Sequence, residues 1–349
     1  MDDSDGGDAN VYEHAITCRN GRGDSVTINP CIAAYVWTSK GVLSAARASI
    51  DELRRCWPDV VIPHGGTADL LANLPRALAV LRSSLVDPRR PDLRYWVGVG
   101  IDGALDAWHA GKLTAAQVVA RHVEVAKMLE RESIEVAVLN GEGKWAIRAG
   151  SIRKRDDVLA LASAVGHAYA EHAPAVVLAL SSFGALGYHA DVRALIEGLT
   201  PHCSIFTGQS YAARPGEVIK GVLPAILERD DRSQGATVKQ GWMRDDSIAD
   251  DDSPDDLDRM PTVQAHKSHP SDLCTVLVQR PHVLVWSVPT IAEGGRADDS
   301  GLEAIEAAIV IRREHGCGVE AIRSFQRAHR LAVDGRAGPE TRRAALASK

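Results

Sequence analysis

The sequence predicts an α/β fold: a (β/α)8 barrel, similar to a TIM barrel, followed by a small all-α C-terminal module. Three observations support this prediction. Short apolar runs alternate with long helical patterns throughout residues 29–315. The runs are continuously apolar, which is typical of parallel strands covered by helices. Eight such units are present, the number that a (β/α)8 barrel requires. Their total length is slightly above the ~250 residues usual for this fold. A doubly wound open sheet is the alternative, but no clear nucleotide-binding loop accompanies the units.

The elements follow in order from residue 1. Residues 1–28 are rich in Asp, Gly and Ser and predict a flexible acidic arm. The expected strands are IAAYVW (32–37), DVVIP (59–63), RYWVGVG (94–100), IEVAVL (134–139), AVVLAL (175–180), CSIFTG (203–208), ATVKQG (236–241) and HVLVWSV (282–288). Helical periodicity fills the intervals, as in residues 68–85 and 114–133. After the seventh expected strand, residues 245–261 form an acidic, proline-bearing segment, which we interpret as a solvated loop.

Composition narrows the class of function. The chain is 45% hydrophobic and 25% charged, with a formal net charge of -6. This mild acidity argues against a nucleic-acid partner, which usually selects a basic face. No apolar run approaches the ~18 residues of a membrane span. The first ten residues lack the basic and apolar parts of a secretory signal, so extracellular action would require phage-type release or a dedicated export route.

The carboxyl ends of barrel strands are where active sites gather. Tryptophans lie at or just beyond several expected strand ends, and aromatic faces stack on the apolar faces of sugar rings. Amides and hydroxyls near them would bind sugar hydroxyl groups. The candidate substrate-binding residues are therefore Trp37, Asn140, Gln209, Tyr211, Trp242 and Trp286.

Two acidic residues are candidates for catalysis. Glu142 directly follows the fourth expected strand between two glycines, a position suited to general acid-base work. Glycoside hydrolysis normally needs a second carboxylate, for which Asp102 after the third strand is the first candidate. Asp245 and Asp246 are reserves. The sequence leaves open whether the reaction retains or inverts configuration, and whether an N-acetyl sugar supplies its own nucleophile.

The C-terminal residues carry a dense motif. VEAIRSFQRAHRL has helical apolar spacing, and VDGRAGPETRRAAL adds two glycine turns before a second short helix begins at a proline. Residues 316–349 resemble the three-helix peptidoglycan-binding module, with residues 301–314 a candidate for its first helix as well as for the barrel's eighth. The resemblance implies a role at the cell wall. It rests on matching residues that include Phe325, Gln326, Asp334, Gly335, Gly338, Pro339 and Thr341.

The barrel loosely resembles glycoside hydrolases that act on peptidoglycan or chitin-like chains. That resemblance assigns the acidic role at strand four to Glu142, although Asn140 stands where an Asp is common. It implies a lysozyme- or glucosaminidase-like wall hydrolase that needs no metal or organic cofactor. Two alternatives remain: a non-catalytic peptidoglycan-binding protein with a degenerate barrel, or a metal-dependent amidase or deacetylase that uses His64, His189 and His202 near strand ends.

Overall fold

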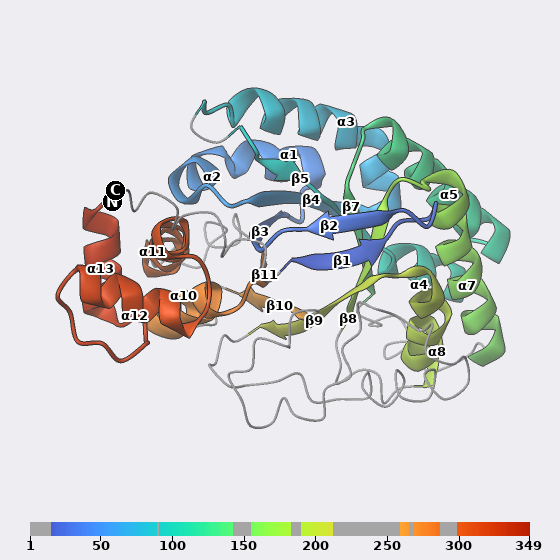
Figure 1. Ribbon diagram of the computed structural model, residues 1–349. Helices are drawn as coiled ribbons and strands as arrows, with labels where there is room; N and C mark the ends of the chain where they lie inside the picture. Colours follow the sequence, from blue (N-terminus) through green and yellow to red (C-terminus); the bar gives the residue numbers. More distant parts are fainter. Residues whose placement is uncertain are drawn as a thin grey trace.

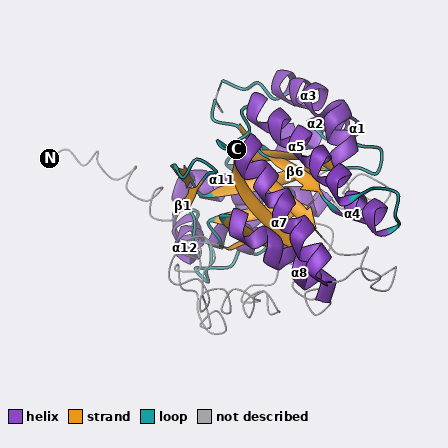
Figure 2. Cartoon of the chain, turned by 90° about the vertical axis from the view of Figure 1, so that its right-hand side faces the viewer, coloured by secondary structure: helices purple, strands orange, loops and turns teal. Residues whose placement is uncertain are grey.

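The computed structural model describes residues 15–88, 91–141, 155–182, 190–211, 259–264, 269–286 and 299–349. Within these ranges, eight parallel strands form a closed barrel in the order β3-β4-β6-β7-β8-β9-β10-β11. The ring closes because β3 pairs with both β4 and β11. Helices surround the strands (Figure 2). The predicted (β/α)8 architecture is confirmed.

The barrel strands are β3 (Cys31–Val36), β4 (Val60–Gly66), β6 (Val97–Gly100), β7 (Val136–Gly141), β8 (Val177–Ser182), β9 (Ile205–Tyr211), β10 (Arg259–Gln264) and β11 (His282–Trp286), and a short β5 (Arg94–Tyr95) also pairs with β4. The covering helices are α1 (Val42–Ala48), α2 (Ile50–Cys56), α3 (Thr67–Ser84), α4 (Asp102–His109), α5 (Ala115–Arg131), α7 (Arg155–His172), α8 (Ala190–Leu199), α10 (Pro270–Gln279) and α11 (Asp299–His315), with a 3-10 turn, η2 (Thr200–His202), before β9. None of the helices in the described ranges is long and apolar enough to cross a membrane.

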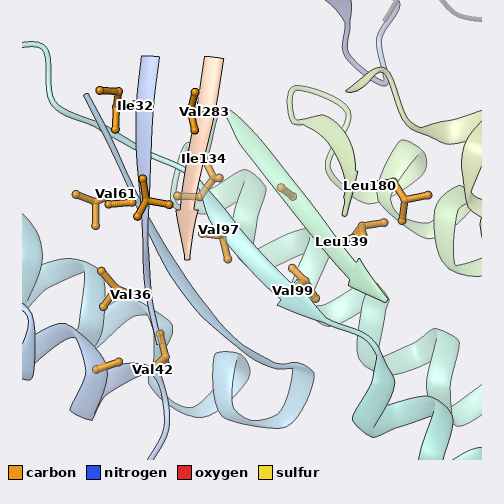
Figure 3. Close-up of a cluster of buried hydrophobic side chains, with 14 of the residues drawn as sticks. Ile32, Val36, Val42, Val61, Val97, Val99, Ile134, Leu139, Leu180 and Val283 are labelled. Carbon is orange, nitrogen blue, oxygen red and sulfur yellow. The ribbon is translucent and has the colours of Figure 1, made fainter. Parts of the chain in front are cut away.

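The largest hydrophobic core lies between the outer face of the barrel and the helices. Alternate strand residues such as Val61, Val97 and Leu139 point outward into it, because successive side chains of a strand face opposite sides (Figure 3). The helices contribute their apolar stripes, for example Leu70, Leu74 and the neighbouring buried positions of α3. This two-sided burial explains why the strands read as continuous apolar runs.

A second core fills the barrel itself, and a hairpin closes its lower end. The antiparallel strands β1 (Ile16–Arg19) and β2 (Ser25–Ile28) insert Ile16 and Ile28 into this inner cluster. The hairpin is held to segments that precede barrel strands, through bonds from Arg22 N to Pro174 O (3.0 Å) and from Ser204 Oγ to Arg19 O (2.6 Å). It therefore covers the amino-terminal end of the barrel.

The predicted flexible arm is thus wrong for residues 16–28. Their alternating burial marks strand β1, but two four-residue strands are too short to stand out in the sequence. Burial in the barrel stabilises them, and this burial cannot be read from local composition.

The seventh strand also differs from the prediction. The strand between β9 and β11 is β10, whereas residues 236–241 lie outside the described residues. β10 overlaps the end of the predicted acidic loop at 245–261. Pro261 lies within β10, although proline removes a ladder donor. The pairing of β10 with β9 accommodates it beside a register shift between Thr262 and Val263.

The C-terminal module packs directly on the barrel's last helices. Its helices α12 (Val319–Ala328) and α13 (Pro339–Ala347) lie against α10 and α11 (Figure 1). Three bonds tie them to α10: Gly318 N to Val278 O (2.9 Å), Ala337 N to Thr275 Oγ1 (2.9 Å) and Gln279 Nε2 to Gly335 O (3.3 Å). Helix α11 is therefore both the barrel's eighth helix and a wall of the module.

Because Ile322, Phe325 and Ala345 belong to the same core cluster as the barrel helices, barrel and module should unfold together. Ile322 is fully buried. We expect Ile322→Ala to lower the free energy of unfolding by about 2–5 kcal/mol and to shift one transition shared by the whole chain. Calorimetry with far-UV circular dichroism would check this. Two separate transitions, of which only one moves, would contradict it.

Candidate functional site

The site is built from the upper layers of the barrel interior. In a closed barrel the strands are tilted, so side chains at one height come from alternate strands. The strand registers place positions 62, 138, 207 and 284 in one layer, 35, 98, 181 and 262 in the next, and 64, 140, 209 and 286 in the layer nearest the carboxyl ends. The interior changes upward from aliphatic residues to aromatic and polar ones.

Aromatic rings form a continuous cluster on one side of this mouth. Trp286 at the end of β11 contacts three of them, with ring centroids 4.7 Å from Tyr35, 5.0 Å from His64 and 5.8 Å from Trp37. His64 stands edge-on to both Trp286 and Tyr35. The strands β3 and β4 follow each other along the chain, whereas β11 lies beside β3 only because the barrel closes. Closure thus joins the predicted pair Trp37 and Trp286 and adds Tyr35 and His64.

His64 is almost enclosed in this cluster, with 5% of its surface exposed. Burial lowers the pKa of its imidazole to about 4, so the ring is neutral near pH 7. Within the described structure its Nδ1 atom has no hydrogen-bond partner. The buried Oγ1 of Thr207, on the opposite wall and two layers below, also lacks one among the described residues.

Glycines of β6 make room for this imidazole. Gly98 pairs with His64 in the sheet, and a Cβ at residue 98 would lie 2.4 Å from His64 Nδ1 and 3.0 Å from Tyr35 Cε1. At residue 100 a Cβ would meet His64 Nε2 at 3.5 Å. The GVG sequence of β6 therefore serves the packing of His64, since any side chain at Gly98 would collide with the ring.

The two candidate catalytic residues follow paired strands. Asp102 begins α4, two residues beyond β6, at the positive end of the helix dipole. The N–H of Ile101 donates to the carbonyl of Asn140 (3.0 Å), and Gly100 pairs with Asn140 in the sheet. The start of α4 is thus tied to the end of β7. Glu142, the residue after Gly141 of β7, lies outside the described residues.

The other predicted residues are placed as follows. Asn140 is buried at the mouth, and Gln209 and Tyr211 belong to β9. Trp242 and the reserves Asp245 and Asp246 lie outside the described residues, as does His189. His202 belongs to η2, directly before β9, so it lies near a strand end as predicted, but at the opposite end of the barrel from His64, and the structure does not bring these two candidate ligands together. Among the described residues, no group of three His, Cys, Asp or Glu side chains is arranged to hold a metal.

The module's motif residues form its internal scaffold. The buried amide of Gln326 donates to Asp334 Oδ1 (2.8 Å), Arg336 O (3.0 Å) and Thr341 Oγ1 (3.1 Å), and it accepts from the N–H groups of Asp334 and Gly335. Five bonds from one side chain therefore hold the loop between α12 and α13.

The remaining motif positions support the same loop. Gly335 has a φ of 73°, a left-handed conformation that favours glycine. Gly338 and Pro339 begin α13, and Phe325 is fully buried and stacks on His329 with ring centroids 4.1 Å apart. Phe325, Gln326 and Thr341 are thus buried structural residues. A wall ligand would meet other side chains of the module.

Sequence reasoning missed Tyr35 as a mouth residue and considered His64 only as a metal ligand. The signal for His64 was the pair of glycines at 98 and 100, one of which faces it across the sheet. That signal becomes readable only once the register is known.

Comparison with known proteins identifies the module. Residues 319–345 match the family described as "Putative peptidoglycan binding domain". This confirms the predicted resemblance for the C-terminal helices. A search of curated proteins gave no match for the chain.

Solved structures similar to the whole chain are distant. They include a GH18 chitinase from Pseudoalteromonas aurantia (10% identity, TM-score 0.43, covering 79% of this chain and 99% of that chain). Another is an endo-beta-N-acetylglucosaminidase from Cordyceps militaris (12%, 0.40, 83% and 92%). A third is N-acetylneuraminate lyase from Fusobacterium nucleatum (8%, 0.36, 91% and 95%). At these scores the likeness carries no argument about activity, and the barrel rests on its own strand pairing.

Replacing Gln326 tests the scaffold interpretation. Gln326→Ala removes five hydrogen bonds and leaves the buried Gly335 N–H without its acceptor, so we expect a loss of about 2–4 kcal/mol in the free energy of unfolding. Gln279→Ala, which removes one bond of 3.3 Å, is the matched control and should cost under about 1 kcal/mol. Urea unfolding measures both. Equal effects would contradict the scaffold role.

The buried imidazole of His64 predicts acid sensitivity. The unfolded chain takes up a proton as pH falls through about 6.5, whereas the folded protein does so only near its lowered pKa of about 4. This contribution to stability is complete above pH 6.5 and is lost as pH falls toward 4. From pH 7 to 4.5 we expect wild type to lose about 2–3 kcal/mol more than His64→Gln, measured by urea unfolding. Equal losses would contradict the assignment.

Proposed function

We propose that this protein is a peptidoglycan hydrolase that cleaves glycosidic bonds between N-acetylated sugars and is held on the wall by its C-terminal module. One observation carries the proposal: a module matching the peptidoglycan-binding family shares a hydrophobic core with a (β/α)8 barrel whose mouth is aromatic and polar. The module directs the protein to the cell wall. The barrel then acts on the polymer to which the module is bound.

The chemistry of the mouth supports a sugar substrate. Trp286 and Trp37 are only partly buried, and their rings lie 5.8 Å apart at an interplanar angle of 31°. Such rings offer apolar faces for sugar rings. The amide of Asn140 and the position of Gln209 in the same layer suit hydroxyl and acetamido groups.

In this mechanism Glu142 protonates the glycosidic oxygen as the bond to the departing sugar breaks. Asp102 would take one of several roles. It would stabilise the positive charge that develops at the anomeric carbon, attack that carbon as a nucleophile, activate water, or hold the acetamido group of the substrate. The start of helix α4 at Asp102 suits a negatively charged group. The strands that precede the two candidate residues are neighbours, since Gly100 pairs with Asn140 in the sheet.

A non-catalytic wall-binding protein is the second candidate. The layer nearest the mouth carries His64, Asn140 and Trp286 among its described side chains, none of which is a carboxylate. A barrel of this composition would grip a glycan without cleaving it. The distinction depends on Glu142.

The test is Glu142→Gln on purified peptidoglycan, with released reducing sugars and sedimentation of the protein followed together. We expect the variant to lose about 10²- to 10⁴-fold in release while still sedimenting with the wall, because only proton transfer is removed. Glu124→Gln, at an exposed position of α5, is the matched control and should behave as wild type.

Sedimentation without release from either protein would reject the hydrolase and leave the binder. Failure of both proteins to sediment would reject the wall anchor.

A further inference from the structure

We propose that His64 is a sugar-binding residue, whose imidazole hydrogen-bonds a hydroxyl or acetamido group of a ring stacked on Trp286. The inference deepens the proposed function and rests on it for the class of ligand. Sequence reasoning gave His64 only a metal-binding alternative. Three features support the inference: the geometry of the aromatic cluster, its charge, and the surroundings of the two ring nitrogens of His64.

The geometry places His64 beside the stacking surface. Its ring stands edge-on to Trp286, with centroids 5.0 Å apart and planes at 72°. Tyr35 packs against both rings from the neighbouring strand. Trp286 keeps part of its surface exposed. A sugar ring lying on Trp286 would therefore meet the edge of the His64 imidazole.

The charge of the cluster suits an uncharged ligand. Desolvation by burial lowers the pKa of His64, and no carboxylate among the described residues opposes it by stabilising an imidazolium. The described side chains of the layer are an imidazole, an amide and an indole, without a cation for a carboxylate or phosphate ligand. A neutral imidazole donates through one nitrogen and accepts through the other, which fits a hydroxyl or an amide.

The two ring nitrogens of His64 lie in different surroundings. The ring is 95% buried, and its Nδ1 has no hydrogen-bond partner among the described residues. Nδ1 faces Gly98, since a Cβ built on Gly98 would lie only 2.4 Å from this nitrogen. Nε2 faces Gly100 at the carboxyl end of β6, and a Cβ built on Gly100 would lie 3.5 Å from it. We therefore assign Nε2 as the nitrogen that contacts the sugar.

The experiment measures binding of the N-acetylglucosamine tetrasaccharide to the full chain by tryptophan fluorescence at pH 7. Three variants separate the nitrogens: the amide of His64→Gln reaches the Nε2 position, that of His64→Asn reaches Nδ1, and His64→Leu has neither. We expect His64→Leu and His64→Asn to weaken binding about 10-fold, and His64→Gln to stay within about 3-fold of wild type.

A second measurement uses the wild-type protein, so it does not depend on the variants folding. Nitrogen-15 NMR of the imidazole, assigned by loss of the signal in His64→Gln, should show Nε2 shifting when the tetrasaccharide is added. Wild-type affinity in a folded His64→Leu, or an unchanged imidazole spectrum on saturation, overturns the proposal. Retention by His64→Asn but not by His64→Gln overturns the choice of Nε2.

The outcome separates this inference from the proposed function. Binding that depends on His64, in a protein that releases no sugar from peptidoglycan, supports the inference and rejects the hydrolase. If sugar release depends on Glu142 but tetrasaccharide binding is unchanged by substitution of His64, the hydrolase is supported and the inference is rejected. Absence of tetrasaccharide binding by the wild type overturns the inference.

Discussion

The pairing of β3 with both β4 and β11 is the constraint on which the rest of this structure depends. It closes the sheet, so that the first, second and last strands of the barrel become neighbours. Tyr35, His64 and Trp286 come from these strands and meet only there. Closure also creates the enclosed interior, which the β1–β2 hairpin covers at one end and aromatic and polar side chains occupy at the other. An open sheet of the same strands would separate β3 from β11, and Trp286 would then lose its contacts with the other rings of the cluster.

The composition of the barrel interior changes with height. The layer of Ile62, Val138 and Leu284 is mainly aliphatic, although it includes Thr207, whose Oγ1 lacks a partner among the described residues. The layer nearest the carboxyl ends holds His64, whose buried Nδ1 also lacks a partner there. Buried polar groups normally find partners, and exceptions concentrate where a ligand binds. The stability given up at the mouth is offset by the apolar layers below it.

The C-terminal module is built onto the barrel rather than joined to it by a linker. Its motif residues, Gln326 above all, hold its own loop together, while α10 and α11 supply the surface on which it folds. A module built on the barrel's helices keeps a fixed orientation to the mouth, unlike one joined by a flexible linker. If the module holds the wall and the barrel cuts it, the position of the cut relative to the anchor is set by rigid structure. The loop residues that define the family by sequence are therefore informative about fold, and less so about ligand contacts.

The sequence by itself determined the class of the fold and the identity of the module. Alternation of apolar runs and helical patterns predicted seven of the eight barrel strands, and the Phe325–Gln326 to Thr341 spacing predicted the module, because both are set by local periodicity and turn chemistry. It also named Trp37, Asn140, Asp102 and Trp286 as mouth residues. Tertiary structure alone decided the rest. This includes the hairpin at residues 16–28, the use of Arg259–Gln264 as the seventh strand, the separation of His202 from His64 at opposite ends of the barrel, and the contact of His64 with Gly98. Each depends on burial or register between segments far apart in the chain, and no local pattern records which distant strand will lie beside it.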